Sequence, residues 1–154
     1  MKALVQRVSR AAVRVLDREV AAIGPGMLVL VGVEIGDGEA DADRLAKRTA
    51  HLRVFADPDG RMNLDVVQVG GAALVVSQFT LAASTRRGRR PSYERAAEPE
   101  TAERLYLRFA EGLRRAGVPT CTGVFRAMME VELVNDGPVT ILLASGQGER
   151  GDHG

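Results

Sequence analysis

Two apolar runs constrain the fold of this chain more than any other feature. They occupy residues 27–33 and 72–76 and contain no charged or amide side chain. A run without polar alternation is typical of a strand that is buried on both faces. Because neither face of such a strand can stay in water, other elements must cover the sheet that contains it.

The remaining pattern predicts more strands and two main helices. Apolar residues recur at helical spacing in residues 41–52 and again from Pro99 to Gly117, where proline suits the first turn and glycine the end. Gly24-Pro25-Gly26 predicts a turn. Short β-rich stretches predict strands at residues 3–8, 11–16, 19–23, 129–134 and 139–144. We therefore expect one α/β domain with mostly antiparallel strands.

Composition agrees with a single globular domain. The chain has 154 residues, of which 45% are hydrophobic and 27% charged. Aromatic residues make up only 4% and tryptophan is absent, so Val, Leu, Ile and Ala must build the core, which favours sheets. We expect the domain to span residues 1–144. Residues 145–154 are rich in glycine and are expected to form a disordered tail.

Charge and reactive residues exclude several classes of function. The formal net charge is +1, so any contact with nucleic acid needs a local basic patch. Cys121 is the only cysteine and His51 and His153 are the only histidines, which argues against a disulfide or a zinc site. No apolar run approaches the roughly 20 residues of a membrane span, and no leader pattern is visible. We expect a cytoplasmic protein without metal or cofactor.

The first candidate site is Ser77-Gln78-Phe79-Thr80, which follows the second apolar run. In a regular strand Ser77 and Phe79 share one face and Gln78 and Thr80 the other, so they serve one pocket only if the chain turns. The residues alone favour a polar strand end that caps a loop. No G-x-S-x-G pattern surrounds Ser77, and His51 lies on the first expected helix, so a catalytic triad is not expected.

The second candidate is the segment that contains Asn135, Gly137 and Pro138. Asn, Asp, Gly and Pro are turn residues, so the simpler interpretation is a hairpin turn between two strands. A cis Gly137-Pro138 peptide, which costs about 0.5–1 kcal/mol, would point its carbonyl groups in one direction at the tip of such a hairpin. The sequence leaves the cis and trans isomers both open.

The third candidate is a basic run at residues 86–90. Arg86, Arg87, Arg89 and Arg90 can bind phosphates through planar, bidentate hydrogen bonds. A solvated charged loop is the more common role of such runs. The position of this run just after Ser77-Thr80 adds weight to a phosphate-binding role.

Seven stretches together resemble the D-aminoacyl-tRNA deacylase family across nearly the whole chain. Any one stretch is weak evidence, but their number, order and spacing make the match specific. They are residues 6–11, 23–26, 52–55, 62–64, 76–81, 86–92 and 133–140.

The resemblance implies a homodimer of three-layer α/β/β domains with a barrel-like core and two active sites at the subunit interface. The implied substrate is tRNA esterified with a D-amino acid, or alanine tRNA mischarged with glycine, and the reaction is hydrolysis of that ester. Gly137-Pro138 of one subunit, in cis, is implied to enter the pocket of the other. Rigid carbonyl groups there can bind the α-amino group and leave no space for an L side chain.

The resemblance also implies roles for individual residues. The catalytic pocket is formed by Ser77, Gln78, Phe79 and Thr80, and backbone N–H groups near Phe79 and Thr80 stabilise the oxyanion. The tRNA 2′-hydroxyl is implied to assist the attacking water, with Thr80 as nucleophile the less favoured alternative. Substrate selection is implied for Gly137, Pro138, Asn135 and Met129, with Arg7 holding the Gly-Pro pair, and tRNA binding for the four arginines.

Three residues depart from the family pattern, and two other functions compete. Arg126 stands where the family usually has glycine, Met128 where it often has aspartate, and Asp65 where serine is usual. The first alternative is an RNA-binding module without catalysis that uses the basic run. The second is a serine esterase for small substrates, which requires a reactive Ser77.

Overall fold

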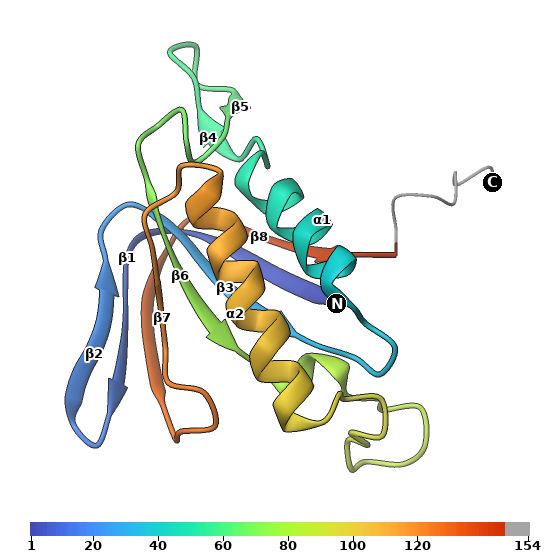
Figure 1. Cartoon of the computed structure of the whole chain (residues 1–154). Helices are drawn as coiled ribbons and strands as arrows, with labels where there is room; N and C mark the ends of the chain where they lie inside the picture. Colours follow the sequence, from blue (N-terminus) through green and yellow to red (C-terminus); the bar gives the residue numbers. More distant parts are fainter. Residues whose placement is uncertain (147–154) are drawn as a thin grey trace.

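The computed structural model describes residues 1–146. Nearly the whole of this part of the chain folds around one mixed sheet with two long helices against it (Figure 1). The elements are β1 (Lys2–Val15), β2 (Arg18–Ile23), β3 (Gly26–Gly32), α1 (Glu39–Ala50), β4 (Phe55–Ala56), β5 (Met62–Leu64), β6 (Ala72–Ser77), a 3-10 helix η1 (Phe79–Ala82), α2 (Pro99–Arg115), β7 (Thr120–Thr122) and β8 (Glu130–Ala144).

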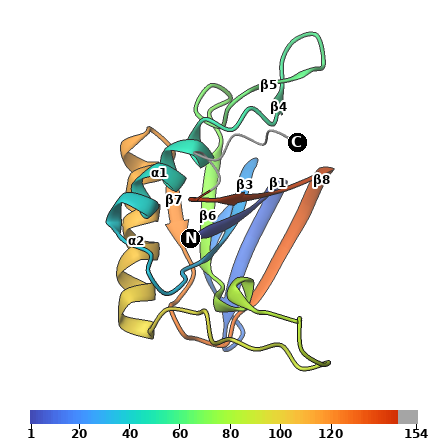
Figure 2. The same cartoon turned by 90° about the vertical axis from the view of Figure 1, so that its right-hand side faces the viewer.

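The sheet is organised around β1, which has neighbours on both sides. The strand order is β2-β1-β3-β6-β7, and β8 also pairs with β1. The first half of β1 lies between β3 and β8, and its second half lies between β2 and β8. Pairs that involve β1 are antiparallel, whereas β3, β6 and β7 run parallel. The strongly curved sheet closes nearly into a barrel, as expected (Figure 2).

Two apolar cores lie on opposite faces of this sheet. Helices α1 and α2 pack side by side over one face (Figure 2). Leu45 and Phe109 of these helices are fully buried in one core with Val29 and Val75 of the sheet. The other face is covered by the far half of β1 with β2 and the start of β8, and its centre is Leu28 and Leu74. Residues 27–33 and 72–76 are therefore covered on both faces along most of their length, as their sequence predicted, and only Leu30 and Ala72 within them are partly exposed.

Several expected boundaries were wrong. The strands expected at residues 3–8 and 11–16 are one strand, β1, which ends at Val15, and those expected at 129–134 and 139–144 are one strand, β8, which begins at Glu130. Residues 135–138 do not form a hairpin turn, because both halves of β8 pair with the same strand and the register only shifts between them. The short strands β4, β5 and β7 were not expected.

The N-terminus is tied to the end of β8. The Met1 amino group lies 2.7 Å from Asp37 Oδ2 and donates a hydrogen bond of 3.0 Å to Ser145 Oγ, while the Ser145 N–H donates to the Met1 carbonyl. Of the tail expected at residues 145–154, residues 147–154 lie outside the described part of the chain. None of the helices in residues 1–146 is long and apolar enough to cross a membrane.

Candidate functional site

A cavity of about 520 Å³ opens at the carboxyl end of β6. The end of β6 forms one wall, the loop before β8 forms another, and the start of α2 with the segment before it forms a third. Apolar side chains and small residues dominate the lining, which suits a ligand with a large organic surface. The lining residues are Val33, Val76, Ser77, Gln78, Phe79, Ala96, Ala97, Pro99, Ala102, Phe125, Arg126, Ala127, Met128, Met129 and Val131.

The first motif reaches this cavity because the chain turns directly after β6. The strand ends at Ser77, the Gln78 N–H donates to the Val31 carbonyl at 2.7 Å, and Phe79 begins the 3-10 helix η1. Ser77, Gln78 and Phe79 consequently line the same cavity, although a regular strand would separate them. Thr80 is exposed and lies outside the lining, where its hydroxyl pairs with Gln78 Nε2.

Two aromatic pairs support the walls. The Phe79 ring contacts Tyr93 edge-on at 5.1 Å, and Phe125 stacks on Tyr106 at 5.6 Å. Tyr106 comes from the buried face of α2, and burial raises the pKa of its phenol. Tyr106 therefore stays neutral near pH 7 and acts as a rigid support for Phe125.

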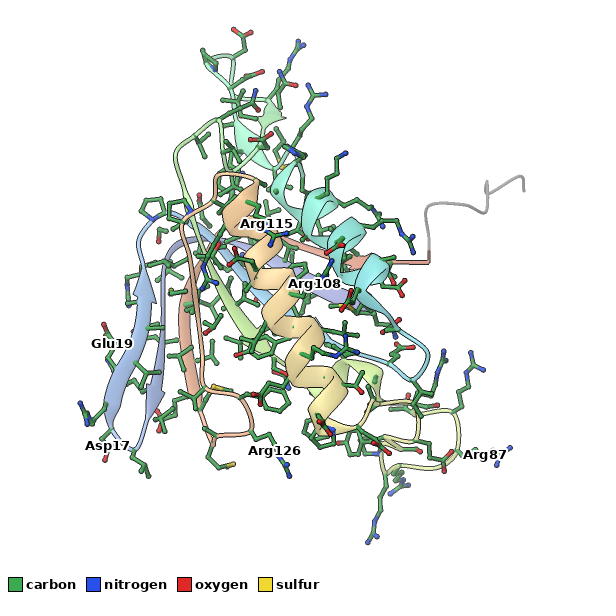
Figure 3. The ribbon with its side chains drawn as sticks, viewed as in Figure 1. Asp17, Glu19, Arg87, Arg108, Arg115 and Arg126 are labelled. Carbon is green, nitrogen blue, oxygen red and sulfur yellow. The ribbon has the colours of Figure 1, made fainter. Side chains whose placement is uncertain are left out.

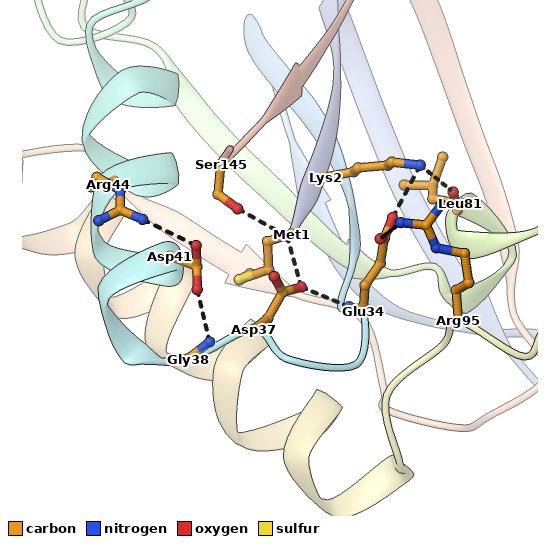
Figure 4. Close-up of polar contacts among 10 residues, drawn as sticks. All are labelled: Met1, Lys2, Glu34, Asp37, Gly38, Asp41, Arg44, Leu81, Arg95 and Ser145. Carbon is orange, nitrogen blue, oxygen red and sulfur yellow. Dashed lines mark hydrogen bonds and ion pairs between the residues drawn. The ribbon is translucent and has the colours of Figure 1, made fainter. Parts of the chain in front are cut away.

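A charged cluster holds two walls of the cavity together (Figure 4). Lys2 Nζ lies 3.0 Å from Glu34 Oε1 and donates to the Leu81 carbonyl of η1 at 3.4 Å. Glu34 Oε2 also lies 3.3 Å from Arg95 Nη2, and the two residues after Arg95 line the cavity. The Glu34 side chain is only 14% exposed, so its two cationic partners compensate a largely desolvated charge. This cluster orients η1 relative to the segment that leads into α2.

The second motif lies away from this cavity. Gly137 and Pro138 form a cis peptide in the middle of β8, where the register with β1 shifts. Asn135 spans the shift, because its Nδ2 donates to the carbonyls of Arg7 and Val139 at 2.9 and 3.0 Å. Gly137 has φ 122°, and neither it nor Pro138 lines the cavity.

Arg7 lies directly beneath the second motif. Its guanidinium donates to the Val54 carbonyl at 2.6 Å and to the Asp136 carbonyl at 3.2 Å, and its side chain is only 14% exposed. A Cβ added to Gly137 would lie 2.8 Å from Arg7 Nη2. The segment from Asp136 to Pro138 therefore packs against a mostly buried arginine side chain.

The third motif forms an exposed loop. Arg86, Arg87, Arg89 and Arg90 lie between Ser84 and Ser92, whose backbones pair with each other, and all four arginines are exposed. Figure 3 shows Arg87 and Arg126 projecting at the end of the molecule where η1 and the start of α2 lie. The cavity and the basic loop thus share one end of the fold.

Other reactive residues lie elsewhere. His51 caps α1 and pairs with Asp65, and Cys121 is half-buried on β7, where burial raises the pKa of its thiol. Within residues 1–146, no group of three or more His, Cys, Asp or Glu residues is arranged to hold a metal ion. Sequence reasoning missed the contribution of Ala96, Ala97 and Ala102, since small apolar residues carry no recognisable chemical signal.

Comparisons with known proteins agree on one family. A family model described as D-Tyr-tRNA(Tyr) deacylase matches residues 4–144. A D-aminoacyl-tRNA deacylase from Syntrophotalea carbinolica is 59% identical over 145 residues, covering 94% of this chain and 97% of the relative. A D-aminoacyl-tRNA deacylase from a Roseiflexus species is 61% identical over 145 residues, covering 94% of each.

Two solved structures share the fold. One, titled c-Myc DNA Unwinding Element Binding Protein, has a TM-score of 0.87 and 39% identity, covering 93% of this chain and 97% of that one. The other, titled a probable eukaryotic D-amino acid tRNA deacylase, has a TM-score of 0.79 and covers 92% and 97%. At 17% identity the second similarity shows the fold alone.

The contacts of Arg7 beneath residues 136–138 predict that replacing Arg7 costs much more stability than replacing Arg10, an exposed arginine of the same strand. Arg7→Met leaves the Val54 and Asp136 carbonyls without their donor, and we expect the free energy of unfolding to fall by about 1–3 kcal/mol. Arg10→Met is the matched control, because Arg10 makes only an exposed ion pair with Glu132 that water screens. Urea unfolding measures both, and equal losses would contradict the role given to Arg7.

Proposed function

The chain belongs to the D-Tyr-tRNA(Tyr) deacylase family, and we propose that it cleaves the ester of D-aminoacyl-tRNA to release tRNA and free D-amino acid. Membership makes it a D-aminoacyl-tRNA deacylase, an ester hydrolase that serves proofreading in translation. The observation that carries the detailed proposal is the cavity at the end of β6, where Ser77, Gln78 and Phe79 converge. We extend the substrates to glycyl-tRNA mischarged on alanine tRNA, since glycine has no side chain to exclude.

The lining supports hydrolysis in which the protein supplies no general base. Among the described lining residues Arg126 alone is ionisable, and an arginine stays protonated. We propose that the ribose 2′-hydroxyl next to the ester assists the attacking water. The first N–H groups of a helical turn have no acceptor within it, so those near Phe79 and Thr80 are available to the developing oxyanion.

The separation of the two motifs supports a site that two subunits share. Ser77 pairs with Val31 and so lies level with Ala3 of β1, whereas Gly137 lies opposite the Arg7 region. Ser77 and Gly137 are therefore separated by four residues along the strand direction, or roughly 13 Å. They are also separated by three strand spacings across the sheet, or roughly 14 Å. We propose that Gly137-Pro138 of a partner subunit enters the cavity and excludes L side chains, with Met129 and Asn135 completing the selection.

An apolar surface supports the proposed homodimer. Leu4, Leu30 and Leu142 lie side by side on neighbouring strands, on the sheet face opposite the helices. Leu142 is 52% exposed in the single chain. A second copy related by twofold symmetry can cover such a surface with the same surface of its own.

The basic loop supports contact with the tRNA backbone. Arg86, Arg87, Arg89 and Arg90 are exposed at the same end of the molecule as the cavity, where phosphates of an entering 3′ end pass (Figure 3). Arginines in a loop bind phosphates without reading sequence, which suits an enzyme that accepts many tRNAs. We propose the cytoplasm as its location, because charged tRNA is used there.

A second candidate function is nucleic-acid binding without hydrolysis. The observation that favours it is the structural relative titled c-Myc DNA Unwinding Element Binding Protein, together with the exposed basic loop. This alternative requires salt-sensitive binding of nucleic acid with no loss of amino acid from any charged tRNA.

The first prediction concerns chirality. We expect rapid release of D-tyrosine from D-tyrosyl-tRNA, while L-tyrosyl-tRNA survives, because the proposed exclusion acts on the configuration at Cα. The two substrates are incubated with equal enzyme and the remaining aminoacyl ester is measured over time. Equal rates would reject stereochemical exclusion, and no release from either would favour the binding-only alternative.

The second prediction separates two mechanisms. Thr80→Ala is expected to retain substantial activity, because Thr80 is exposed and lies outside the lining. Replacing the 2′-hydroxyl of the terminal adenosine by hydrogen is expected to lower the single-turnover rate by at least about 100-fold, the usual contribution of acid–base assistance. The opposite pattern, with Thr80→Ala inactive and the deoxy substrate cleaved, would identify Thr80 as the nucleophile.

The third prediction tests the shared site by subunit mixing. Phe79→Ala damages the cavity, and Gly137→Ala forces a Cβ to within 2.8 Å of Arg7 Nη2, so each variant alone is expected to lose activity. A mixed dimer keeps one intact site, which restores about a quarter of the original rate when subunits assort at random.

Mixing Phe79→Ala with Gln78→Ala is the control for this experiment. Both changes lie in the same motif, so every mixed site is damaged and no recovery is expected. Absence of recovery in the first mixture, with dimers confirmed by mass, would place both motifs in one subunit's site.

A further inference from the structure

Arg126 is the one charged side chain among the residues that line the cavity. The other lining residues are aliphatic, aromatic, hydroxyl, amide or thioether side chains. A neutral cavity has no local anion to cancel a positive charge at its edge, so the field of Arg126 acts on whatever enters. The side chain at position 126 therefore decides whether the cavity attracts a negatively charged group of a ligand.

The backbone fixes where this side chain points. Arg126 is the third residue of a turn that is closed by a hydrogen bond of 3.2 Å from the Ala127 N–H to the Val124 carbonyl. Its φ is 64°, in the left-handed region that residues with a side chain rarely adopt. The side chain consequently leaves the loop between β7 and β8 and projects at the cavity end of the molecule (Figure 3).

The Arg126 guanidinium has no anionic partner within residues 1–146. None of the ion pairs or side-chain hydrogen bonds of the described residues includes it. Nine other arginines in this part of the chain form ion pairs, such as Arg108 with Asp43 and Arg10 with Glu132. An unpaired guanidinium offers its planar set of donors to a ligand, and it matches a phosphate through two parallel hydrogen bonds.

We propose that Arg126 binds the 5′-phosphate of the terminal nucleotide, the phosphate nearest to the ester that is cleaved. This inference rests on the proposed function, which places the terminal adenosine ester in the cavity. One ribose separates the ester from that phosphate, so the phosphate reaches the cavity edge when the ester lies beside Ser77 and Phe79. The four arginines at residues 86–90 contact phosphates farther along the RNA, and Arg126 alone recognises the one at the cavity.

Two small substrates isolate this contact from the rest of the tRNA. One is the 3′-D-tyrosyl ester of adenosine, which has no phosphate, and the other is the same ester of adenosine 5′-monophosphate. The readout is the ratio of kcat/KM for the phosphate-bearing ester to that for the phosphate-free ester. We expect this ratio to be about ten at low salt and to approach one at high salt, because an exposed ion pair is screened.

Variants at Arg126 then test the assignment. Arg126→Gln and Arg126→Gly are expected to reduce the ratio to about one, and glycine suits φ 64° so that this variant keeps the turn. Arg126→Lys is expected to give a ratio between one and that of the original enzyme, since lysine keeps the charge but loses the bidentate geometry. Arg115→Gln is the matched control, because Arg115 is exposed at the far end of α2 and is expected to keep the full ratio (Figure 3).

The outcomes separate the two levels of the proposal. If the original enzyme cleaves both esters and the glutamine variant keeps the full phosphate preference, Arg126 is not the phosphate contact and the proposed function stands. If the original enzyme cleaves both esters at the same rate, the cavity edge does not recognise phosphate. If it cleaves neither these esters nor D-tyrosyl-tRNA, the proposed function itself fails.

Discussion

The antiparallel pairing of β1 with β8 is the constraint on which the rest of the structure depends. β1 is hydrogen-bonded along both edges, so strand pairing on both sides sets its position in the sheet. β8 follows β1 from Arg14 back to Lys2, and its register shifts on both sides of Val8, which leaves residues 136–138 unpaired in the ladder beside Arg7. The pairing of β3 with β6 then sets the height at which β6 ends and the cavity opens.

Local sequence predicted the elements whose burial is uniform and missed those that depend on distant partners. Residues 27–33 and 72–76 were predicted as doubly buried strands because nothing polar interrupts them. The amphipathic helices were predicted because Leu105, Phe109 and Leu113 repeat at helical spacing. Residues 135–138 were expected to reverse the chain, but turn-forming residues also fit a bulge, and only the long partner strand β1 distinguishes the two.

The candidate site was predictable to a similar extent. Ser77, Gln78 and Phe79 are recognisable because polar residues end a buried run, although their convergence needs the 3-10 turn that sequence did not predict. Ala96 and Ala97 line the cavity only because they are small and because the ion pair of Arg95 with Glu34 holds their segment there. A contact between residues so far apart in the chain leaves no recognisable pattern in the local sequence. The position of Arg126 at the cavity edge likewise depends on a turn with positive φ, which glycine would adopt more readily.

Apart from Arg126, the cavity is lined by uncharged side chains, which favours selection of the aminoacyl group by shape over selection by charge. With no ionisable side chain but Arg126 in its lining, the cavity can distinguish substrates by where backbone atoms lie. The contacts of Lys2 with Glu34 and of Arg7 with the Val54 and Asp136 carbonyls hold that backbone in place. Lys2 and Arg7, both on β1, hold η1 and residues 136–138 respectively. One rigid strand therefore carries the supports of both motifs. In the proposed dimer, twofold symmetry brings the η1 side of one copy to the Gly137 side of the other, so a single well-fixed strand determines the geometry of both sites.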